Sequence, residues 1–300
     1  MAAIVVTYNR RALVEECVGC LMRQTAPADI LVIDNASTDG TDRALAPLVE
    51  RGAIRYENTG RNLGGAGGFQ YGLRLAVKLG YGLLWIMDDD AMPTPTALEA
   101  LLDAAKGAGE YGFLSGRVLW TDGSLCRMNI QRDLRMNNLA DLSADKVPCG
   151  AATFVSLLVP ARVVREVGLP IGEFFIWADD LEYTRRISRR YPCYVIPASV
   201  TVHKCRTNNG GNISTDSADR IDRYRYAYRN EVYIYRRAGL SGYRRLLLRT
   251  PLHMLRVLAK ARDTRLLRIR VILGATLKGF GFHPRIEYID QTPGDEDESH

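Results

Sequence analysis

Residues 82–87 form an apolar run that ends abruptly in three consecutive carboxylates, Asp88, Asp89 and Asp90. The length and character of the run predict a strand that is buried on both faces. Three neighbouring Asp side chains cannot be buried without a cation, because removing unpaired carboxylates from water is very costly. We therefore expect the triplet at the carboxyl end of a parallel strand, where open α/β sheets bind ligands.

The spacing within the triplet suggests a role for two of its members. Alternate residues on an extended backbone point the same way, so Asp88 and Asp90 could share one hard divalent cation while Asp89 is directed elsewhere. The simpler interpretation is a solvated acidic turn that caps the following helix. The triplet alone leaves both interpretations open.

The order of expected elements indicates an α/β fold with a doubly wound, Rossmann-like sheet. Strand and helix alternate four times before residue 90, which is typical of parallel strands joined by helices. Later strands predict a mixed extension of this sheet, and residues 121–146 read as a long polar loop. The expected strands are 2–9, 30–33, 53–56, 82–87, 113–120, 149–159, 193–197 and 199–203, and the expected helices are 11–22, 41–49, 69–79, 94–105, 161–167 and 181–190.

Charge divides the chain into a body, a basic arm and a tail. The 300 residues carry a net charge of +6, yet fifteen Lys and Arg face only three acids between Arg220 and Arg270. We predict a body at 1–215, a basic helical region at 216–285 and an acidic, disordered tail at 286–300. A strand begins almost at the N-terminus and no long apolar stretch occurs, so we expect neither a signal peptide nor a membrane-spanning helix.

The basic arm has the composition of a membrane-surface helix. Thr250 and Pro251 predict a helix start, and Leu252, Leu255 and Leu258 follow at helical spacing among arginines. Leucines, tyrosines and arginines together favour an amphipathic helix on an anionic membrane surface. A helical hairpin packed within the protein is the alternative. Nucleic acid is not an expected partner, because no nucleic-acid-binding motif accompanies the charge.

Six cysteines form no framework of pairs. Cys17 and Cys20 give a C-x-x-C, but they lie in an amphipathic helical pattern with no second pair beside them. We therefore expect reduced thiols in a cytosolic protein rather than disulfides or a zinc site.

Polar residues end the first two expected strands. Asp34 ends the second strand, where a carboxylate can accept a hydrogen bond from the base or ribose of a nucleotide. Thr7 and Asn9 end the first strand and would flank the same crevice. Alternatively, Asp34 only caps a turn.

A Gly-rich segment, 58–68, follows the third strand. It is not the dinucleotide phosphate fingerprint, which belongs after the first strand. Its position instead suggests close approach of the backbone to a ligand, with polar contacts from Arg61 and Asn62.

A second acidic pair, Asp179 and Asp180, lies beside Trp177. Two carboxylates at a helix start gain from the helix dipole, which is the simpler interpretation. One of them could instead serve as a general base if it faces the crevice. His203 ends the last expected strand. It is either structural or a third protein ligand in a site that already has two carboxylates.

Four segments resemble, in order, the motifs of family 2 of the inverting nucleotide-sugar glycosyltransferases, which have the GT-A fold. They are VVTYNR (5–10), VIDNASTDG (32–40), DDD (88–90) and WADDLEY (177–183), and the resemblance covers roughly residues 1–205. Within this family, NLGGAGGF (62–69) is similar to the galactofuranosyltransferases of actinobacterial cell-wall assembly, and the short chain resembles the initiating enzymes among them.

The resemblance implies a function for the chain. It implies transfer of galactofuranose from UDP-galactofuranose to a rhamnosyl-GlcNAc-diphosphoryl-decaprenol lipid in arabinogalactan synthesis, at the cytoplasmic face of the plasma membrane. One alternative is a rhamnosyltransferase that uses dTDP-rhamnose. The alternative from another class is a non-catalytic membrane protein that binds nucleotide sugars, although such a protein need not retain metal and base residues.

The resemblance also implies roles for individual residues. Asp180 would be the catalytic base, since its place in the motif favours it over Asp179. The other implied roles are nucleotide-sugar binding for Thr7, Asn9, Asp34, Arg61, Asn62, Gly65 and Asp89, Mn²⁺ or Mg²⁺ binding for Asp88, Asp90 and His203, and acceptor binding for Trp177 and Asp179.

Overall fold

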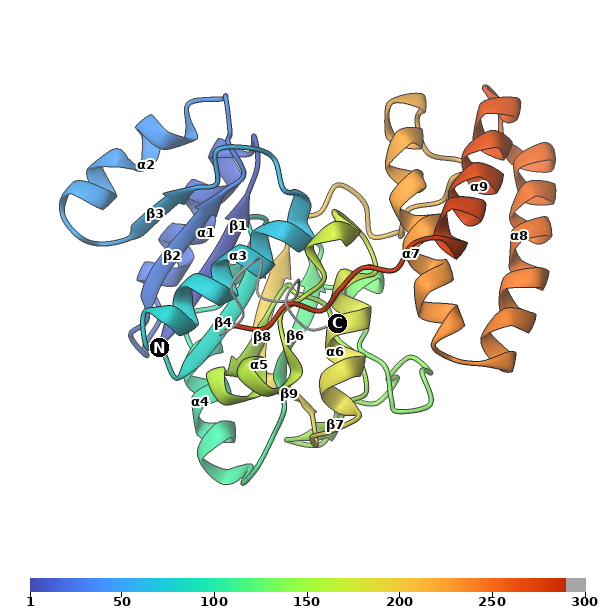
Figure 1. The fold of residues 1–300 in the computed structure, drawn as a ribbon. Coiled ribbons are helices and arrows are strands. Elements are labelled where there is room, and N and C mark those ends of the chain that lie inside the picture. Colours follow the sequence, from blue (N-terminus) through green and yellow to red (C-terminus); the bar gives the residue numbers. More distant parts are fainter. Residues whose placement is uncertain (290–300) are drawn as a thin grey trace, which may run out of the picture.

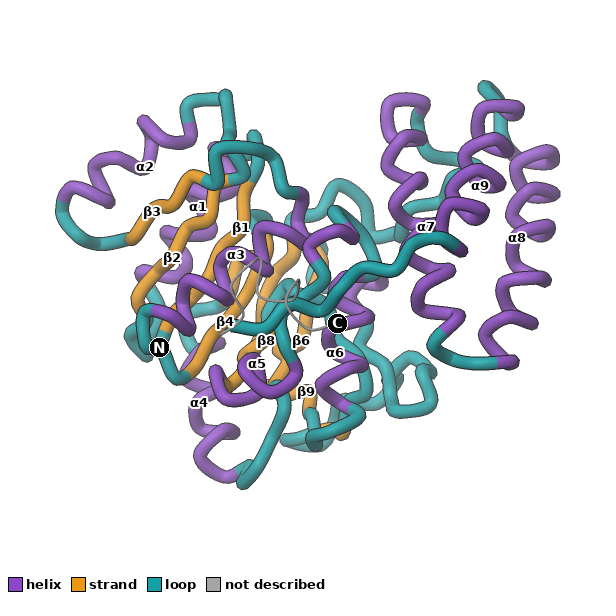
Figure 2. Tube along the Cα trace, in the orientation of Figure 1, coloured by secondary structure: helices purple, strands orange, loops and turns teal. Residues whose placement is uncertain are grey.

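The computed structural model describes residues 1–289. A nine-stranded mixed sheet forms the centre, helices cover both of its faces, and α7, α8 and α9 stand beside it (Figures 1 and 2). The strands are β1 (Ala2–Thr7), β2 (Asp29–Asp34), β3 (Arg55–Asn58), β4 (Leu83–Asp88), β5 (Ala91–Pro93), β6 (Leu114–Trp120), β7 (Val147–Pro148), β8 (Leu157–Pro160) and β9 (Tyr194–His203). The helices are α1 (Arg11–Met22), α2 (Thr41–Glu50), α3 (Gly64–Lys78), α4 (Ala97–Gly107), α5 (Ala161–Val167), α6 (Asp179–Ser188), α7 (Tyr224–Arg236), α8 (Leu240–Lys260) and α9 (Arg265–Phe280), with short 3-10 helices η1 (Arg127–Asn129), η2 (Gly172–Phe174) and η3 (Ala218–Arg223).

The sheet has a parallel half and a mixed half. Its strand order is β3-β2-β1-β4-β8-β6-β9-β5, with β7 paired to β9. Strands β1 to β4 are parallel to one another, and β8 then runs antiparallel to both β4 and β6. Thr7 lies opposite Asp34, and Val6 lies opposite Asp88. The predicted α/β fold with a mixed extension is confirmed, and the sheet gathers polar strand ends along one edge.

Burial on both faces explains the continuous apolar runs. All six residues of β1 are buried. Ile4 and Val6 belong to the apolar cluster that includes residues of α3, α5 and α6, whereas Ala3 and Val5 belong to the cluster that includes residues of α1 and α4. Because successive side chains of a strand point to opposite faces, β1 needs apolar residues at every position. Polar side chains are therefore displaced to the strand ends.

The Gly-rich segment is largely the start of a helix. Helix α3 begins at Gly64 rather than at residue 69. A Cβ atom on Gly68 would lie 2.5 Å from Cγ1 of Val6, and one on Gly64 would collide with the backbone of Phe175. Most of these glycines thus allow close packing within the protein, and the approach of this backbone to a ligand stays a prediction. Gly65 has open space around its Cα atom.

Three expected strands differ in the structure. Residues 149–156 form no regular strand, since Ala151 makes only an isolated bridge with Arg132 and Thr184 of α6 bonds the backbone of Ala152. The two expected strands 193–197 and 199–203 form one strand, β9. Its register against β6 jumps from Ile196 to Val200, so that a bulge accommodates Pro197, which has no N–H for the ladder.

The arm consists of helices that pack on one another. Tyr228 of α7, Val257 of α8 and Ile272 of α9 share one buried cluster, as the packed-hairpin alternative predicts for part of the arm. Helix α8 begins at Leu240, and Pro251 lies in its interior, so the expected start at residue 250 is wrong. Packing of α8 offsets the backbone bond that Pro251 removes. No helix within residues 1–289 is long and apolar enough to cross a membrane.

After α9 the chain returns to the body (Figure 1). The N–H of Leu169 donates to the carbonyl of Glu287 at 2.8 Å, and Ile289 is buried. Residues 286–289 are therefore ordered, and the expected tail boundary is wrong for them because isoleucines interrupt the polar sequence. The predicted disorder of the remaining tail, including Asp295 and Glu298, concerns residues outside the described range.

We expect Gly68→Ala to lower the free energy of unfolding by about 1–3 kcal/mol, because the added methyl group overpacks the contact with Val6. Gly65→Ala, in the same helix, is the matched control and should lose no stability. Urea denaturation of both variants checks the prediction. Equal stability of the two variants would contradict the packing role of Gly68.

Candidate active site

A cavity of about 630 Å³ opens at the polar edge of the sheet. Four of its carboxylates come from two distant parts of the chain, the end of β4 and the start of α6, and Asp219 of η3 also lines it. The predicted site residues that line it are Gly65, Asp88, Asp90, Trp177, Asp179, Asp180 and His203. The fold thus brings residues of three sequence motifs together at one cavity. The first and the last of these motifs are more than ninety residues apart in the sequence.

Asp88, Asp90 and His203 form a group with the geometry of a cation site. Each offers one ligand atom, and these atoms lie within 4.8 Å of one another. Nε2 of His203 is 3.0 Å from Oδ1 of Asp90. Two carboxylates suit the hard cations Mn²⁺ and Mg²⁺, and an imidazole is a common third ligand of transition metals. The residues present therefore fit such a cation.

Burial and the neighbouring charges shift the pKa values of all three side chains in this group. Burial, followed by the charge of Asp90, raises the pKa of Asp88 to about 7. Burial also opposes ionisation of Asp90, but His203 and Arg10 lower the pKa of Asp90 below its ordinary value. Burial disfavours the cationic form of His203, yet hydrogen bonds to Asp90 and Cys126 and the nearby carboxylates raise its pKa to about 10. Asp88 and His203 thus carry protons near neutral pH that a divalent cation has to displace.

The positive charge of Arg10 compensates the negative charge of two carboxylates. Its guanidinium lies 3.1 Å from Oδ1 of Asp89 and 2.7 Å from Oδ2 of Asp90. The hydroxyl of Thr7 donates to Oδ2 of Asp89 at 2.8 Å, so Asp89 is turned toward the end of β1. Arg10 was not among the predicted site residues, although it is the last residue of the first family-like segment.

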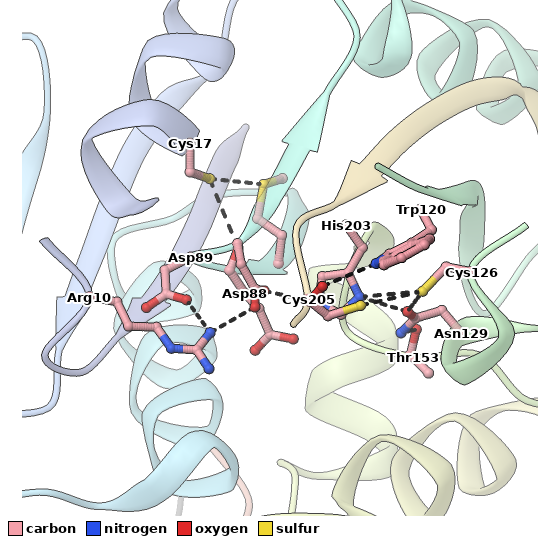
Figure 3. A network of polar contacts seen from close by, with 12 residues as sticks. Arg10, Cys17, Asp88, Asp89, Trp120, Cys126, Asn129, Thr153, His203 and Cys205 are labelled. Carbon is pink, nitrogen blue, oxygen red and sulfur yellow. Dashed lines mark hydrogen bonds and ion pairs between the residues drawn. The ribbon is translucent and has the colours of Figure 1, made fainter. Parts of the chain in front are cut away.

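Asn129 fixes the orientation of His203. Its Oδ1 lies 2.7 Å from Nδ1 of His203, and its amide donates to the hydroxyl of Thr153 at 2.9 Å. Because an amide oxygen only accepts, Nδ1 carries the hydrogen and Nε2 faces Asp90. The thiol of Cys126 is 3.7 Å from the same Nδ1 (Figure 3). No spacing signal reveals Cys126 or Asn129, which precede His203 by more than seventy residues. All six cysteines are free thiols.

A strained loop presents the second acidic pair. Phe175, Trp177 and Ala178 all have positive φ, which is uncommon for residues other than glycine. The buried side-chain amide of Asn230, on α7, donates to the carbonyls of Phe174, Ile176 and Trp177 at 2.9–3.2 Å. The arm therefore holds the loop that leads directly into Asp179 and Asp180.

The two carboxylates of this pair differ in their ionisation. Burial raises the pKa of Asp180 to about 6, while the N–H of Leu181, which donates to its Oδ1 at 2.6 Å, favours the charged form. Burial, Asp180 and Asp88 raise the pKa of Asp179 well above its ordinary value. Burial thus holds the pKa of both carboxyls above the ordinary value, and the N–H of Leu181 favours the charged form of Asp180.

The remaining predicted site residues lie outside this cavity. Both oxygens of Asp34 are bonded, to the hydroxyl of Tyr56 at 2.5 Å and to the N–H of Ser37 at 2.9 Å. Oδ1 of Asn9 accepts from the N–H of Thr38, and Oδ1 of Asn62 accepts from the N–H of Gly64. Each of these side chains orders a loop at the polar edge. The side chain of Arg61 is exposed.

Three arginines extend the cavity toward the arm, and none was predicted. Arg206, Arg220 and Arg223 line it together with the acidic groups. They come from the loop after β9 and from η3. Positive charge beside a carboxylate group that can hold a cation is typical of sites that bind phosphates.

Comparison with solved structures supports the fold. S. aureus TarS (residues 1–349), in complex with UDP-GlcNAc, is 14% identical to this chain with a TM-score of 0.53, over 94% of this chain and 72% of that one. The mannosyltransferase PcManGT from Pyrobaculum calidifontis, in complex with GDP-Man and Mn²⁺, is 16% identical with a TM-score of 0.54, over 93% and 74%. At these identities the likeness shows the fold alone, which is that of the GT-A glycosyltransferases.

Sequence comparison gives the family. The model of glycosyl transferase family 2 matches residues 2–158. The chain is also similar to the galactofuranosyltransferase GlfT1 of Mycolicibacterium smegmatis, with 29% identity over 80% of this chain and 84% of that one. Fold and site thus define a glycosyltransferase that binds a nucleotide sugar. The chain belongs to glycosyltransferase family 2, and the predicted family and fold are confirmed.

We expect the affinity for Mn²⁺ to fall as the pH is lowered from about 8 to about 6, because binding has to remove protons from Asp88 and His203. Titration calorimetry in two buffers of different ionisation enthalpy measures the protons released. His203→Asn, which has no such proton, should bind more weakly and release about one proton fewer. An affinity that does not change with pH would contradict this account of the site.

Proposed function

We propose that the protein is a metal-dependent, inverting galactofuranosyltransferase. It transfers galactofuranose from UDP-galactofuranose to a rhamnosyl-GlcNAc-diphosphoryl-polyprenol acceptor. The position of Asp180 is the observation that supports this reaction type. Asp180 lines both the acidic cavity and a second cavity toward the arm. The similarity to a galactofuranosyltransferase over most of both chains supports the sugar.

The acidic cavity forms the donor half of the site. Asp88, Asp90 and His203 would hold Mn²⁺ or Mg²⁺, and the cation would supply Lewis-acid stabilisation of the diphosphate leaving group. Arg206 and Arg223 add positive charge for the same group. UDP is then a better leaving group, because the charge that develops on its oxygen is neutralised.

The nucleoside would bind along the ends of β1 and β2. Thr7 and Asp34 lie opposite each other there and would hold uracil, with Asn9 ordering the adjoining loop. Arg61 and Asn62 precede α3, and Gly65, in its first turn, lines the cavity. Its lack of a side chain leaves room for the diphosphate region of the donor.

Asp180 acts as the general base. The acceptor hydroxyl gives its proton to Asp180 while its oxygen bonds to the anomeric carbon and the bond from that carbon to the diphosphate oxygen breaks. This is one displacement, so the configuration at the anomeric carbon inverts. A pKa of about 6 leaves Asp180 ionised at neutral pH.

We predict turnover of UDP-galactofuranose and none of dTDP-rhamnose when each donor is offered with the same synthetic rhamnosyl-GlcNAc lipid. Mass and linkage analysis of the product checks the sugar added. Turnover of dTDP-rhamnose alone would replace the proposed donor, and turnover of neither would favour a binding protein.

The Asp180→Asn variant is the control for the mechanism in the same assay. It should bind UDP like the unmodified protein and lose at least about a hundredfold in rate. The base must be deprotonated to act, so the rate of the unmodified protein at saturating metal should be lost as the pH falls through about 6. Full activity of Asp180→Asn would remove Asp180 from the base role.

The arm would hold the enzyme on the membrane, peripherally at its cytoplasmic face. Leucines stand out from α8 and α9 with 62–80% of their surface exposed, which a helix packed only within the protein would not need. They are Leu240, Leu247, Leu248, Leu255, Leu266 and Leu277. Exposed Arg244, Arg245 and Lys260 of α8 lie among them. An apolar face with a basic border suits the surface of an anionic membrane, where the lipid acceptor resides.

We expect the double variant Leu247→Glu/Leu248→Glu to lose co-sedimentation with vesicles that contain phosphatidylglycerol, because it places two charges in the apolar face. Leu134→Glu, at an equally exposed leucine of the body, is the matched control and should sediment like the unmodified protein. The membrane role is refuted if the double variant also sediments unchanged.

A further inference from the structure

A second cavity, of about 660 Å³, lies between the body and the arm. Residues of α7 and α8 form one side of it, and the loops that contain Arg132 and Thr153 form another. Trp177, Ala178 and Asp180 line both this cavity and the donor cavity. A molecule that fills the second cavity would therefore reach Asp180 from the arm.

Aromatic rings form part of its wall. The rings of Trp177 and Tyr224 lie with their centroids 4.9 Å apart. The hydroxyl of Tyr228 lies 2.7 Å from Nδ1 of His253, which joins α7 to α8 at the cavity. Ring faces of this kind pack against the C–H faces of sugars, while the polar edges of the rings accept and donate hydrogen bonds.

The cavity also holds an oriented carboxylate. Glu231 of α7 is paired with Arg249 of α8 at 2.6 Å. The buried Nε of Arg249 has no hydrogen-bond partner among the described residues, and Arg249 lines the cavity. A carboxylate held by one partner can still accept from a ligand hydroxyl, and a ligand oxygen could satisfy the free donor. These groups match the hydroxyls of a carbohydrate.

At the rim of the cavity, positively charged side chains adjoin the apolar face of the arm. Arg132 and Arg256 both line the cavity, and neither forms a salt bridge with a carboxylate in the described part of the chain. Arg256 follows the exposed Leu255 on α8. A diphosphate at this rim would place an attached prenyl chain beside the exposed leucines.

We propose that this cavity binds the acceptor. Its glycan lies against Trp177 and Tyr228 with a hydroxyl bonded to Glu231, its diphosphate lies at Arg132 and Arg256, and its prenyl chain follows the leucines of α8. The assignment rests on the proposed glycosyl transfer, and it gives the arm a part in recognising the acceptor as well as in membrane binding.

Two ligands and three variants test the assignment by titration calorimetry on the full chain with UDP and Mn²⁺. The ligands are a short-chain alkyl rhamnosyl-GlcNAc diphosphate and the neutral alkyl glycoside of the same disaccharide. Arg256→Ala should weaken binding of the diphosphate about tenfold and leave the neutral glycoside unchanged. Glu231→Gln should weaken both ligands. Arg262→Ala removes an equally exposed charge of the arm outside the cavity and should change neither.

The outcomes distinguish a failure of the acceptor assignment from a failure of the proposed donor. Equal effects of Arg256→Ala and Arg262→Ala, or unchanged binding of both ligands by Glu231→Gln, would overturn the assignment even if UDP-galactofuranose is turned over. Binding with the predicted pattern but no transfer from UDP-galactofuranose would instead overturn the donor and leave the acceptor cavity standing.

Discussion

The charge of five carboxylates at one edge of the sheet governs this site. Asp88 ends β4, Asp89 and Asp90 follow it directly, and Asp179 and Asp180 begin α6. Carboxylates this close and this poorly hydrated repel one another, so they need positive charge or protons. Among the described residues, Arg10 and His203 supply part of the positive charge. The raised pKa values of Asp88 and Asp179 favour protonated carboxyls, which reduces the repulsion further. Under the proposed function, a divalent cation and the arginines near η3 complete the compensation when a diphosphate is bound.

A second constraint places Asp180. The loop before α6 holds three residues other than glycine at positive φ, a conformation that costs free energy and persists only when its surroundings enforce it. Asn230 enforces it with three hydrogen bonds from α7. The arm is therefore not an independent unit of the structure. It fixes the loop that presents Asp180, forms one wall of the adjoining cavity and carries the exposed leucines.

The sequence predicted the features that depend on local pattern. Continuous apolar runs specified β1 and β4 because both faces of these strands are buried, and polar strand ends marked the functional edge. Features that depend on distant packing were missed. Gly64 and Gly68 lie in α3 despite the poor helix propensity of glycine, because a Cβ atom would collide with Phe175 at Gly64 and with Val6 at Gly68. Pro251 lies inside α8 because packing outweighs a lost backbone bond. Asn129 and Asn230 act on residues more than fifty positions away, where no sequence spacing signals a contact.

The central claim is that one base, Asp180, drives a single displacement between the two cavities. The configuration of the newly formed glycosidic bond tests it most directly. We predict that the NMR spectrum of the product made from UDP-galactofuranose and the rhamnosyl-GlcNAc lipid shows an anomeric configuration opposite to that of the donor. A product with the configuration of the donor would contradict the account, because it requires a second displacement and a nucleophile that the account does not contain.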